Sequence, residues 1–311
     1  MKSGAFLAIL SVFLLVSPAQ SLVDNCTVDP EALTWFKYLT FYAWNIQTGN
    51  WTNLGQSSAL KPLQAFHNMS TGGDVKQGML ELSSVFFQPM QEVNASLKGL
   101  TLRQDAYSQW EAQIPAIQAA VDEGAVQGFF LGDELVYSNI TWDQLNRTAS
   151  LVKQTFPSCF LYYNEGGSPL YGGSNINGFH EPYPFVPHSF DFVSSDDYHS
   201  IDTQESPRWF YEKYLYPKMS AAQRAFVVPP VFAWLWRANT TVTSWDLQQL
   251  EEGHGYIQWI GQDSRIVGVN GFHLASYPPQ DLGLSYPLPL TLQCYQALAT
   301  QLRDAARTHR T

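Results

Sequence analysis

The sequence contains few charged residues, and basic residues are the scarcer kind. Charged side chains make up 14% of its 311 residues, and 17 Lys and Arg stand against 27 Asp and Glu, which gives a formal net charge of -10. Nucleic acids and anionic membranes are bound by basic surface patches. We therefore expect neither of them as a partner of this protein.

Long hydrophobic runs are also missing. A helix that spans a bilayer needs about 20 apolar residues, and no stretch after the apolar run over 5–16 approaches that length. Lys2 precedes this run and Ala19-Gln20-Ser21 follows it as a cleavage motif, which is the arrangement of a secretory signal peptide. We expect residues 1–21 to be removed and residues 22–311 to form a protein that is secreted or enters the lumen of the secretory and lysosomal pathway.

The sequence carries many sites of the type that secreted proteins glycosylate. Asn-x-Ser/Thr sequons in a chain with a signal peptide predict a glycoprotein. An occupied sequon has to lie on the surface, which restricts where the core can run. The seven sequon asparagines are Asn25, Asn50, Asn68, Asn94, Asn139, Asn146 and Asn239.

Motifs for cofactors, metals and serine nucleophiles are absent as well. The sequence has no Gly-x-Gly-x-x-Gly or P-loop pattern, no His-Glu-x-x-His, no closely spaced cysteine pair and no Gly-x-Ser-x-Gly. The scattered His67, His199 and His273 could converge on a metal, but their spacing matches no known ligand motif. We expect no cofactor and no metal.

Aromatic residues, by contrast, are plentiful. They make up 14% of the chain, with ten Trp and sixteen Tyr. The polar tips of Trp and Tyr need a partner or water, so an excess of these rings is less typical of a plain core. Flat ring faces stack well on the C–H surfaces of sugars, so the composition is compatible with a carbohydrate-binding groove.

Strand-like and helix-like segments alternate along the mature chain, and no linker or repeat divides it. Such an alternation, repeated about eight times, is typical of a parallel barrel. We predict an α/β protein with a single (β/α)8 TIM barrel over residues 22–311. The predicted strands are 35–44, 62–67, 79–87, 127–131, 160–163, 190–194, 226–232 and 267–274, and residues 49–55 are predicted to form a loop. The predicted helices are 102–123, 141–155 with Thr141 as N-cap, 206–219 with Pro207 at the first helical position, 244–260 with Ser244 as N-cap, and 290–307.

The chain has only three cysteines, Cys26, Cys159 and Cys294. In an oxidising compartment an odd count permits at most one internal bridge and leaves one thiol. Because the two ends of the chain meet in a closed barrel, we predict a disulfide between Cys26 and Cys294. The alternative is that all three are small buried hydrophobic residues.

The stretch Gly128-Phe129-Phe130-Leu131-Gly132-Asp133-Glu134-Leu135 places two carboxylates directly after a buried strand. A continuous apolar run is typical of a parallel strand that is covered on both faces. Unpaired carboxylates are strongly disfavoured inside such a strand, so Asp133 and Glu134 should lie where the strand ends. In parallel barrels this end of the strands is where ligands bind and chemistry happens.

Other polar and aromatic residues should gather with this pair on the same rim. Carboxylates flanked by Trp and Tyr suit glycosidic bond cleavage, in which one carboxylic acid protonates the leaving oxygen and a second group stabilises the sugar cation or activates water. A like charge next door raises the pKa of the acid, which then holds its proton near neutral pH. The predicted rim residues are Asn45, His67, Asp133, Glu134, Asn164, Glu165, Asp196, Asp197, Tyr198, His199, Trp234, Trp236, His273 and Tyr277.

Gly132-Asp133-Glu134, backed by Asp196-Asp197-Tyr198 after the sixth strand, resembles glycoside hydrolases with (β/α)8 barrels. The Asp-Glu pair is similar to that of the family 20 hexosaminidases and of other enzymes that use the 2-acetamido group of their own substrate. The sequence departs from two related patterns. Residues 231–236 hold no glutamate for a two-glutamate scheme, and the chitinase motif Asp-x-x-Asp-x-Asp-x-Glu does not fit.

The resemblance implies a role for several of the rim residues. Glu134 would be the general acid and base, and Asp133 would orient the acetamido nitrogen of the substrate. Tyr198 or Tyr277 would hold the acetamido oxygen, and Trp234 or Trp236 would form the floor under the sugar. The alternatives are helix capping for Asp133 and Glu134, turn chemistry for Glu165, Asp196 and Asp197, hydrogen-bonded rim or core positions for His199 and His273, and packing for Trp234 and Trp236.

The sequence is compatible with two functions. The first is a secreted, monomeric glycoside hydrolase that cleaves a glycan with Glu134 as its acid, and N-acetylhexosamine-containing glycans are the nearest candidates. The second is a carbohydrate-binding barrel that has the groove without turnover, as in a lectin. A lectin has no need for a like-charged pair at the centre of the rim, so the sequence favours hydrolysis. A secreted barrel phosphodiesterase would need a cluster of metal ligands and is the least favoured.

Overall fold

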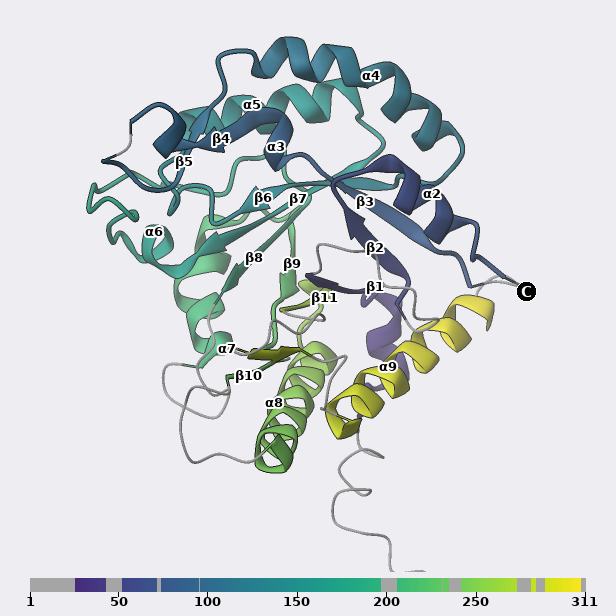
Figure 1. Ribbon diagram of the computed structural model, residues 1–311. Coiled ribbons are helices and arrows are strands. Elements are labelled where there is room, and N and C mark those ends of the chain that lie inside the picture. Colours follow the sequence, from purple (N-terminus) through teal and green to yellow (C-terminus); the bar gives the residue numbers. More distant parts are fainter. Residues whose placement is uncertain are drawn as a thin grey trace, which may run out of the picture.

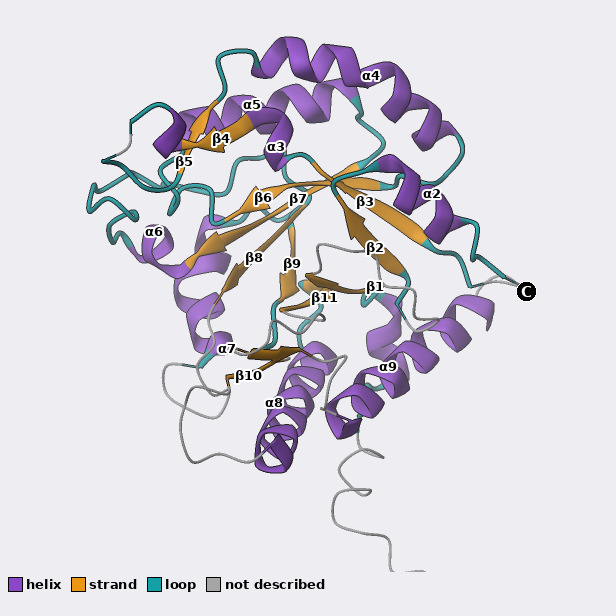
Figure 2. Ribbon diagram, viewed as in Figure 1, coloured by secondary structure: helices purple, strands orange, loops and turns teal. Residues whose placement is uncertain are grey.

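The protein forms an eight-stranded parallel sheet that curls into a nearly closed barrel, with helices outside the ring of strands (Figures 1 and 2). The computed structural model describes residues 26–42, 52–71, 74–94, 96–196, 206–230, 232–234, 242–272, 281–283 and 289–308. This architecture confirms the predicted (β/α)8 barrel. In spatial order the strands are β1 (Tyr38–Tyr42), β11 (Ile266–Phe272), β9 (Arg224–Val227), β8 (Phe192–Asp196), β7 (Phe160–Gly166), β6 (Gly128–Asp133), β3 (Gln77–Glu81) and β2 (Leu54–Ser57).

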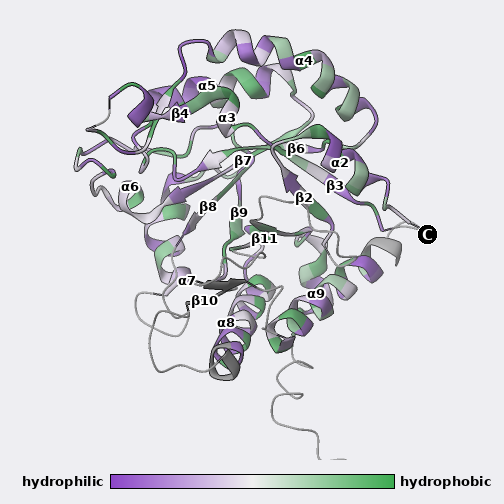
Figure 3. Ribbon diagram, in the orientation of Figure 1, coloured by the Kyte–Doolittle hydropathy of each residue, from purple (hydrophilic) through white to green (hydrophobic). Residues whose placement is uncertain are grey.

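Helices and two small antiparallel sheets complete the described fold. Helices α4 and α5 carry alternating hydrophobic and hydrophilic residues along their length (Figure 3), as expected for helices with one face against a sheet. None of the described helices is long and apolar enough to cross a membrane. The helices are α2 (Leu60–His67), α3 (Ser83–Phe86), α4 (Ala106–Asp122), α5 (Trp142–Thr155), α6 (Gly167–Tyr171), α7 (Pro207–Phe210), α8 (Val242–Gln262) and α9 (Pro289–Thr308). Short helical turns are η1 (Pro30–Thr34), η2 (Met90–Glu92), η3 (Tyr211–Leu215) and η4 (Tyr216–Lys218). The two small sheets pair β4 (Phe87–Pro89) with β5 (Leu100–Leu102) and β10 (Phe232–Trp234) with β12 (Asp281–Gly283).

The barrel interior is a packed core. Because side chains alternate between the two faces of a strand, every second residue points into the barrel and the others pack against the helices. The interior cluster holds Phe130, Tyr162 and Phe226, and Tyr38 stacks on Phe226, so four different strands contribute. Where a strand is regular, residue parity therefore shows which rim residues face the opening of the barrel.

Asn53 closes the barrel where β1 and β2 meet. Its side-chain Oδ1 accepts a hydrogen bond from Leu39 N at 2.8 Å, and its Nδ2 donates to Lys37 O at 2.7 Å. Its backbone N also donates to Leu39 O at 3.3 Å. The amide side chain thus supplies hydrogen bonds that a regular strand pair would make with its backbone.

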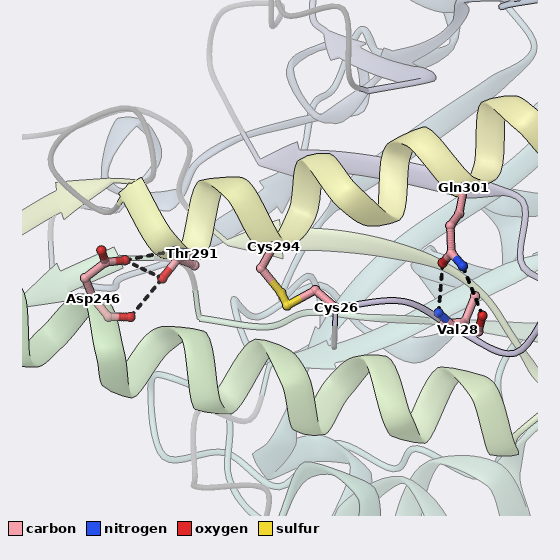
Figure 4. Close-up of a disulfide and its surroundings, with 6 residues drawn as sticks. All are labelled: Cys26, Val28, Asp246, Thr291, Cys294 and Gln301. Atoms are coloured by element: carbon pink, nitrogen blue, oxygen red, sulfur yellow. Dashed lines mark hydrogen bonds between the residues drawn. A yellow bond between two sulfur atoms is a disulfide. The ribbon is translucent and has the colours of Figure 1, made fainter. Parts of the chain in front are cut away.

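A disulfide and the hydrogen bonds of two side chains help to fasten α9 to the rest of the barrel (Figure 4). The Cys26–Cys294 disulfide joins the first described residue to α9, as predicted, and Cys159 is free and buried. Asp246 of α8 accepts hydrogen bonds from Leu290 N and Thr291 N at 2.9 Å each, so it caps the first turn of α9 from a neighbouring helix. Gln301 pairs with the backbone N–H and C=O of Val28 at 2.9 and 3.2 Å.

The helix starts after the fourth and sixth strands were predicted correctly. Thr141 caps α5 in a capping box with Gln144, in which each side chain bonds the backbone N–H of the other residue. Pro207 stands at the first position of α7, where its missing N–H costs nothing. Ser244 is not an N-cap, because α8 begins two residues earlier at Val242.

The second strand was predicted in the wrong place. Residues 62–67 belong to helix α2, whose first turn tolerates Pro62, and they bury Leu63 and Phe66. The true strand is Leu54–Ser57, which overlaps the predicted loop over 49–55. It is buried although it is largely polar, so it lacks the apolar run that marks the other strands.

The third and seventh strands are shorter than predicted. The third ends at Glu81, and the apolar residues after it form α3 and β4. The seventh, β9, ends at Val227, shortly before Pro229 and Pro230, which have no N–H to extend a strand ladder.

Candidate functional site

A β-bulge near the end of β6 places Asp133 at the opening of the barrel. Phe130 pairs with Tyr162 of β7, and the next pair is Asp133 with Asn164, so β6 contains one extra residue. Gly132 lies in this interval with a φ of 155°, a value that side chains other than glycine rarely adopt. Without the extra residue, strand alternation would turn Asp133 away from the interior. The bulge therefore re-aims this carboxylate.

Asp133 lies at the end of a directed chain of hydrogen bonds across the barrel. Asn164 Nδ2 donates to Asp133 Oδ1 at 2.8 Å, and Ser194 Oγ donates to Asn164 Oδ1 at 2.5 Å. Since the Ser194 proton is used in this way, the Tyr162 hydroxyl donates to Ser194 Oγ at 2.7 Å, and Asn270 Nδ2 donates to the Tyr162 hydroxyl at 3.2 Å. All four donors point towards the exposed carboxylate, and hydrogen bonds in such chains polarise one another.

Glu134 begins a single helical turn, residues 134–138, which we call the rim turn. Its φ of 46° is left-handed, an uncommon conformation outside glycine. Ser138 N donates to Glu134 O at 2.6 Å, and Glu134 N donates to Asn164 O at 2.9 Å. A Cβ added at Gly166 would lie 3.1 Å from Glu134 Oε1, so the carboxyl group rests against the barrel-facing side of Gly166.

The carboxyl group of Glu134 holds its proton near neutral pH. Burial, and after it the neighbouring charge of Asp133, raises the pKa of Glu134 to about 7. The side chain is nevertheless still partly exposed, and Asp133 is exposed. The two adjacent carboxyl groups thus occupy different environments. Such a difference allows one site to contain a protonated acid and an ionised carboxylate at the same pH.

Glu165 does not reach the surface, which removes the predicted contact with a substrate. Its side chain is completely buried, and its oxygens accept hydrogen bonds from Val136 N, Tyr137 N and Gly166 N at 3.1, 3.2 and 2.9 Å. Burial is the main cause that raises the pKa of Glu165 to about 8, the three N–H donors act against it, and the charge of Glu134 adds to it.

Replacing Gly132 with alanine should damage this site. The added Cβ would lie 2.7 Å from Leu135 Cδ2, and alanine is strained at this φ. We expect a loss of about 1 to 3 kcal/mol in the free energy of unfolding, measured by chemical denaturation. The matched control is Gly261→Ala in α8, where an added Cβ meets nothing within 4 Å. Equal stability of the two variants would contradict a strained bulge.

The loops around the rim turn are joined through the side chain of Asn139, which lies just beyond it. Asn139 Oδ1 accepts hydrogen bonds from the side-chain amides of Asn175 and Asn177 at 3.0 and 3.2 Å, and Asn139 Nδ2 contacts Met90 Sδ at 3.1 Å. These partners come from the loops that follow β7 and β3. A glycan on Asn139 Nδ2 would require these contacts to break, so the predicted glycosylation at this sequon conflicts with the structure.

The other predicted rim residues are distributed as follows. Asp196 ends β8 and pairs with Gly166 of β7, so it lies on the same rim. His67 does not, because it ends α2 and its Nδ1 contacts Lys76 O ahead of β3. Trp234 belongs to β10, which pairs with β12, and not to the seventh barrel strand. Asn45, Asp197, Tyr198, His199, Trp236, His273 and Tyr277 lie outside the described residues, as do the sequon asparagines Asn25, Asn50 and Asn239.

Four residues of the rim and interior were missed in the sequence. Glu81 ends β3 on the same strand face as Met79 of the interior cluster, and Ser83 Oγ donates to its carboxylate at 2.6 Å. A carboxylate inside the apolar run Met79–Leu82 was the available signal. Tyr162, Ser194 and Asn270 carried no signal of their own, because each is an ordinary strand residue until the barrel brings them together. Among the described residues, no group of three or more His, Cys, Asp or Glu is placed to hold a metal ion.

Comparison with known proteins gives matches in structure alone. No protein-family model and no curated protein matches the sequence. A GH18 chitinase from Pseudoalteromonas aurantia has a TM-score of 0.44 and 12% identity, over 84% of this chain and all of the other. A psychrophilic glycoside hydrolase family 10 endo-beta-1,4-xylanase has a TM-score of 0.45 and 11% identity, over 88% of this chain and 99% of the other. The structural neighbours are thus glycoside hydrolases of very low identity, and no residue role is transferred from them.

Proposed function

We propose that the protein is a glycoside hydrolase in which Glu134 acts as general acid and base. The observation that carries this proposal is the carboxyl group of Glu134, protonated near neutral pH and placed beside the exposed Asp133 at the carboxyl end of a barrel strand. A glycosidic oxygen needs a proton as it leaves, and a group with a pKa near the working pH is the most effective donor. The Cys26–Cys294 disulfide supports a site of action within or beyond the secretory pathway.

Asp133 is the proposed orienting residue for a 2-acetamido substrate. A carboxylate held in place by Asn164 can accept a hydrogen bond from the acetamido N–H, which aims the acetamido oxygen at the anomeric carbon. Such a substrate supplies its own nucleophile. A substrate without the acetamido group would need a second carboxylate, for which Glu81 and Asp196 are the candidates on the described rim.

The proposed acid predicts how hydrolysis depends on pH. Glu134 has to be protonated to act, so kcat/KM should be constant on the acidic side of its pKa and fall as pH rises through about 7. Loss of one proton gives a tenfold fall per pH unit above that point. A profile measured between pH 4 and 9 would contradict the proposal if kcat/KM rose across neutral pH.

The test of the function is a panel of aryl glycosides with and without 2-acetamido groups. Turnover of any member would support a glycoside hydrolase, and turnover confined to the 2-acetamido sugars would support the role of Asp133. Binding to a glycan array without turnover of any substrate would favour the carbohydrate-binding alternative and overturn the proposal.

A further inference from the structure

Glu165 is a buried acid that no step of the proposed reaction uses. A carboxyl group without exposed surface loses the hydration that stabilises its charge, so it needs partners inside the protein. Its carboxyl oxygens accept hydrogen bonds from three backbone N–H groups, two of the rim turn and one of Gly166. Two of these partners, Val136 and Tyr137, follow Glu134 in the chain. The third, Gly166, is the residue against which the carboxyl group of Glu134 lies.

The geometry of these bonds resembles that of a side-chain cap, supplied here from another strand. The rim turn is one isolated turn, and the N–H groups of Val136 and Tyr137 donate to the side chain of Glu165. The carboxyl group therefore satisfies two backbone donors that would otherwise be left without a partner away from water. Glu165 thus holds the rim turn in the conformation that gives Glu134 its left-handed φ and lays its carboxyl group against Gly166.

We propose that Glu165 is a positioning residue for Glu134: its buried carboxyl group accepts hydrogen bonds from the backbone of the rim turn and of Gly166 and so fixes the turn that carries Glu134. The proposal deepens the proposed function and rests on it. Two ionisable groups next to Glu134 are Asp133, which precedes it in the chain, and Glu165 on β7. Glu165 differs from Asp133 in two respects, since it has no contact with solvent and it bonds the turn itself.

The positioning role can be tested without any substrate, by carbon-13 NMR titration of the side-chain carboxyl groups. Glu134→Gln and Glu165→Gln assign the two signals. In Glu165→Gln the rim turn loses its hydrogen bonds and Glu134 becomes more exposed, so the pKa of Glu134 should fall, since burial is the main cause of its rise. In Glu134→Gln the pKa of Glu165 should fall, because the charge of Glu134 raises it. The second variant changes a partly exposed side chain, so it keeps the test valid if Glu165→Gln does not fold. A pKa of Glu134 that stays unchanged in folded Glu165→Gln, or a pKa of Glu165 that stays unchanged in Glu134→Gln, would overturn the proposal.

Kinetics test the positioning role on the active protein. In Glu165→Gln, kcat should fall about 10- to 100-fold with KM within about twofold, and the alkaline fall in the pH profile should move to lower pH. The matched control is Glu111→Gln, an exposed glutamate of α4, which should leave all three quantities unchanged. An unchanged kcat in folded Glu165→Gln would overturn the positioning role. Absence of turnover in the wild type would overturn the proposed function alone, since the titration of Glu134 would still report whether Glu165 holds the rim turn.

Discussion

Replacing Glu134 with glutamine should reduce hydrolysis by a factor of about 100 to 10,000, the usual contribution of a general acid. Glutamine keeps the size of the side chain and its contact with Gly166, but it cannot donate a proton to a leaving oxygen. The loss should appear in kcat. It should be smaller for substrates with activated leaving groups, such as nitrophenyl glycosides, because these need less help from an acid.

Two comparisons separate this result from a general loss of structure. The thermal unfolding midpoint of Glu134→Gln should match or exceed that of the wild type, since the substitution removes a carboxyl group that is costly to ionise. Glu111→Gln, the same exchange at an exposed position, should retain full activity. If Glu134→Gln retained wild-type kcat on substrates with poor leaving groups, Glu134 would not be the acid.

Replacing Cys26 and Cys294 with serine should lower the free energy of unfolding by about 5 to 6 kcal/mol. The bridge closes a loop with a sequence separation of 268 residues, and the chain-entropy model gives a larger stabilisation for longer loops. A loss of this size would be a large part of the stability of a typical domain. The measurement is denaturant unfolding of the double variant and of the wild type.

A reducing agent provides the control for the disulfide experiment. Wild type measured with reductant should unfold at the same denaturant concentration as the double variant, and the double variant should not respond to reductant. Asp246 and Gln301 still hold α9 after the bridge is lost, so the fold should survive at low denaturant. Equal midpoints for wild type and variant without reductant would contradict the prediction.

The sequence was informative wherever strand burial was continuous. Runs such as Phe129–Leu131 and Leu161–Tyr163 are fully buried on both faces, and their apolar composition reported this directly. The second strand could not be found in this way, because Gly55 and Gln56 occupy buried positions in it.

The site could be predicted in location and less well in detail. Asp133 and Glu134 were placed correctly at the end of a strand, since a charged pair cannot continue a buried run. The bulge at Gly132 was not predictable, because the glycine looked like an ordinary strand boundary, whereas its role depends on the pairing with β7. Glu165 had the sequence context of a turn. Only the fold shows that its carboxyl oxygens accept hydrogen bonds from the backbone of the rim turn.

The contacts of Asn139 have a consequence for how the rim opens. The side chain of Asn139, in the loop after β6, bonds the loops that follow β3 and β7, so moving the loop of Asn139 breaks the contacts with both. Such segments tend to open and close as one cooperative unit rather than as independent hinges. Because the rim turn carrying Glu134 lies next to Asn139, the release of a bound molecule and the loosening of the acid would be parts of one event.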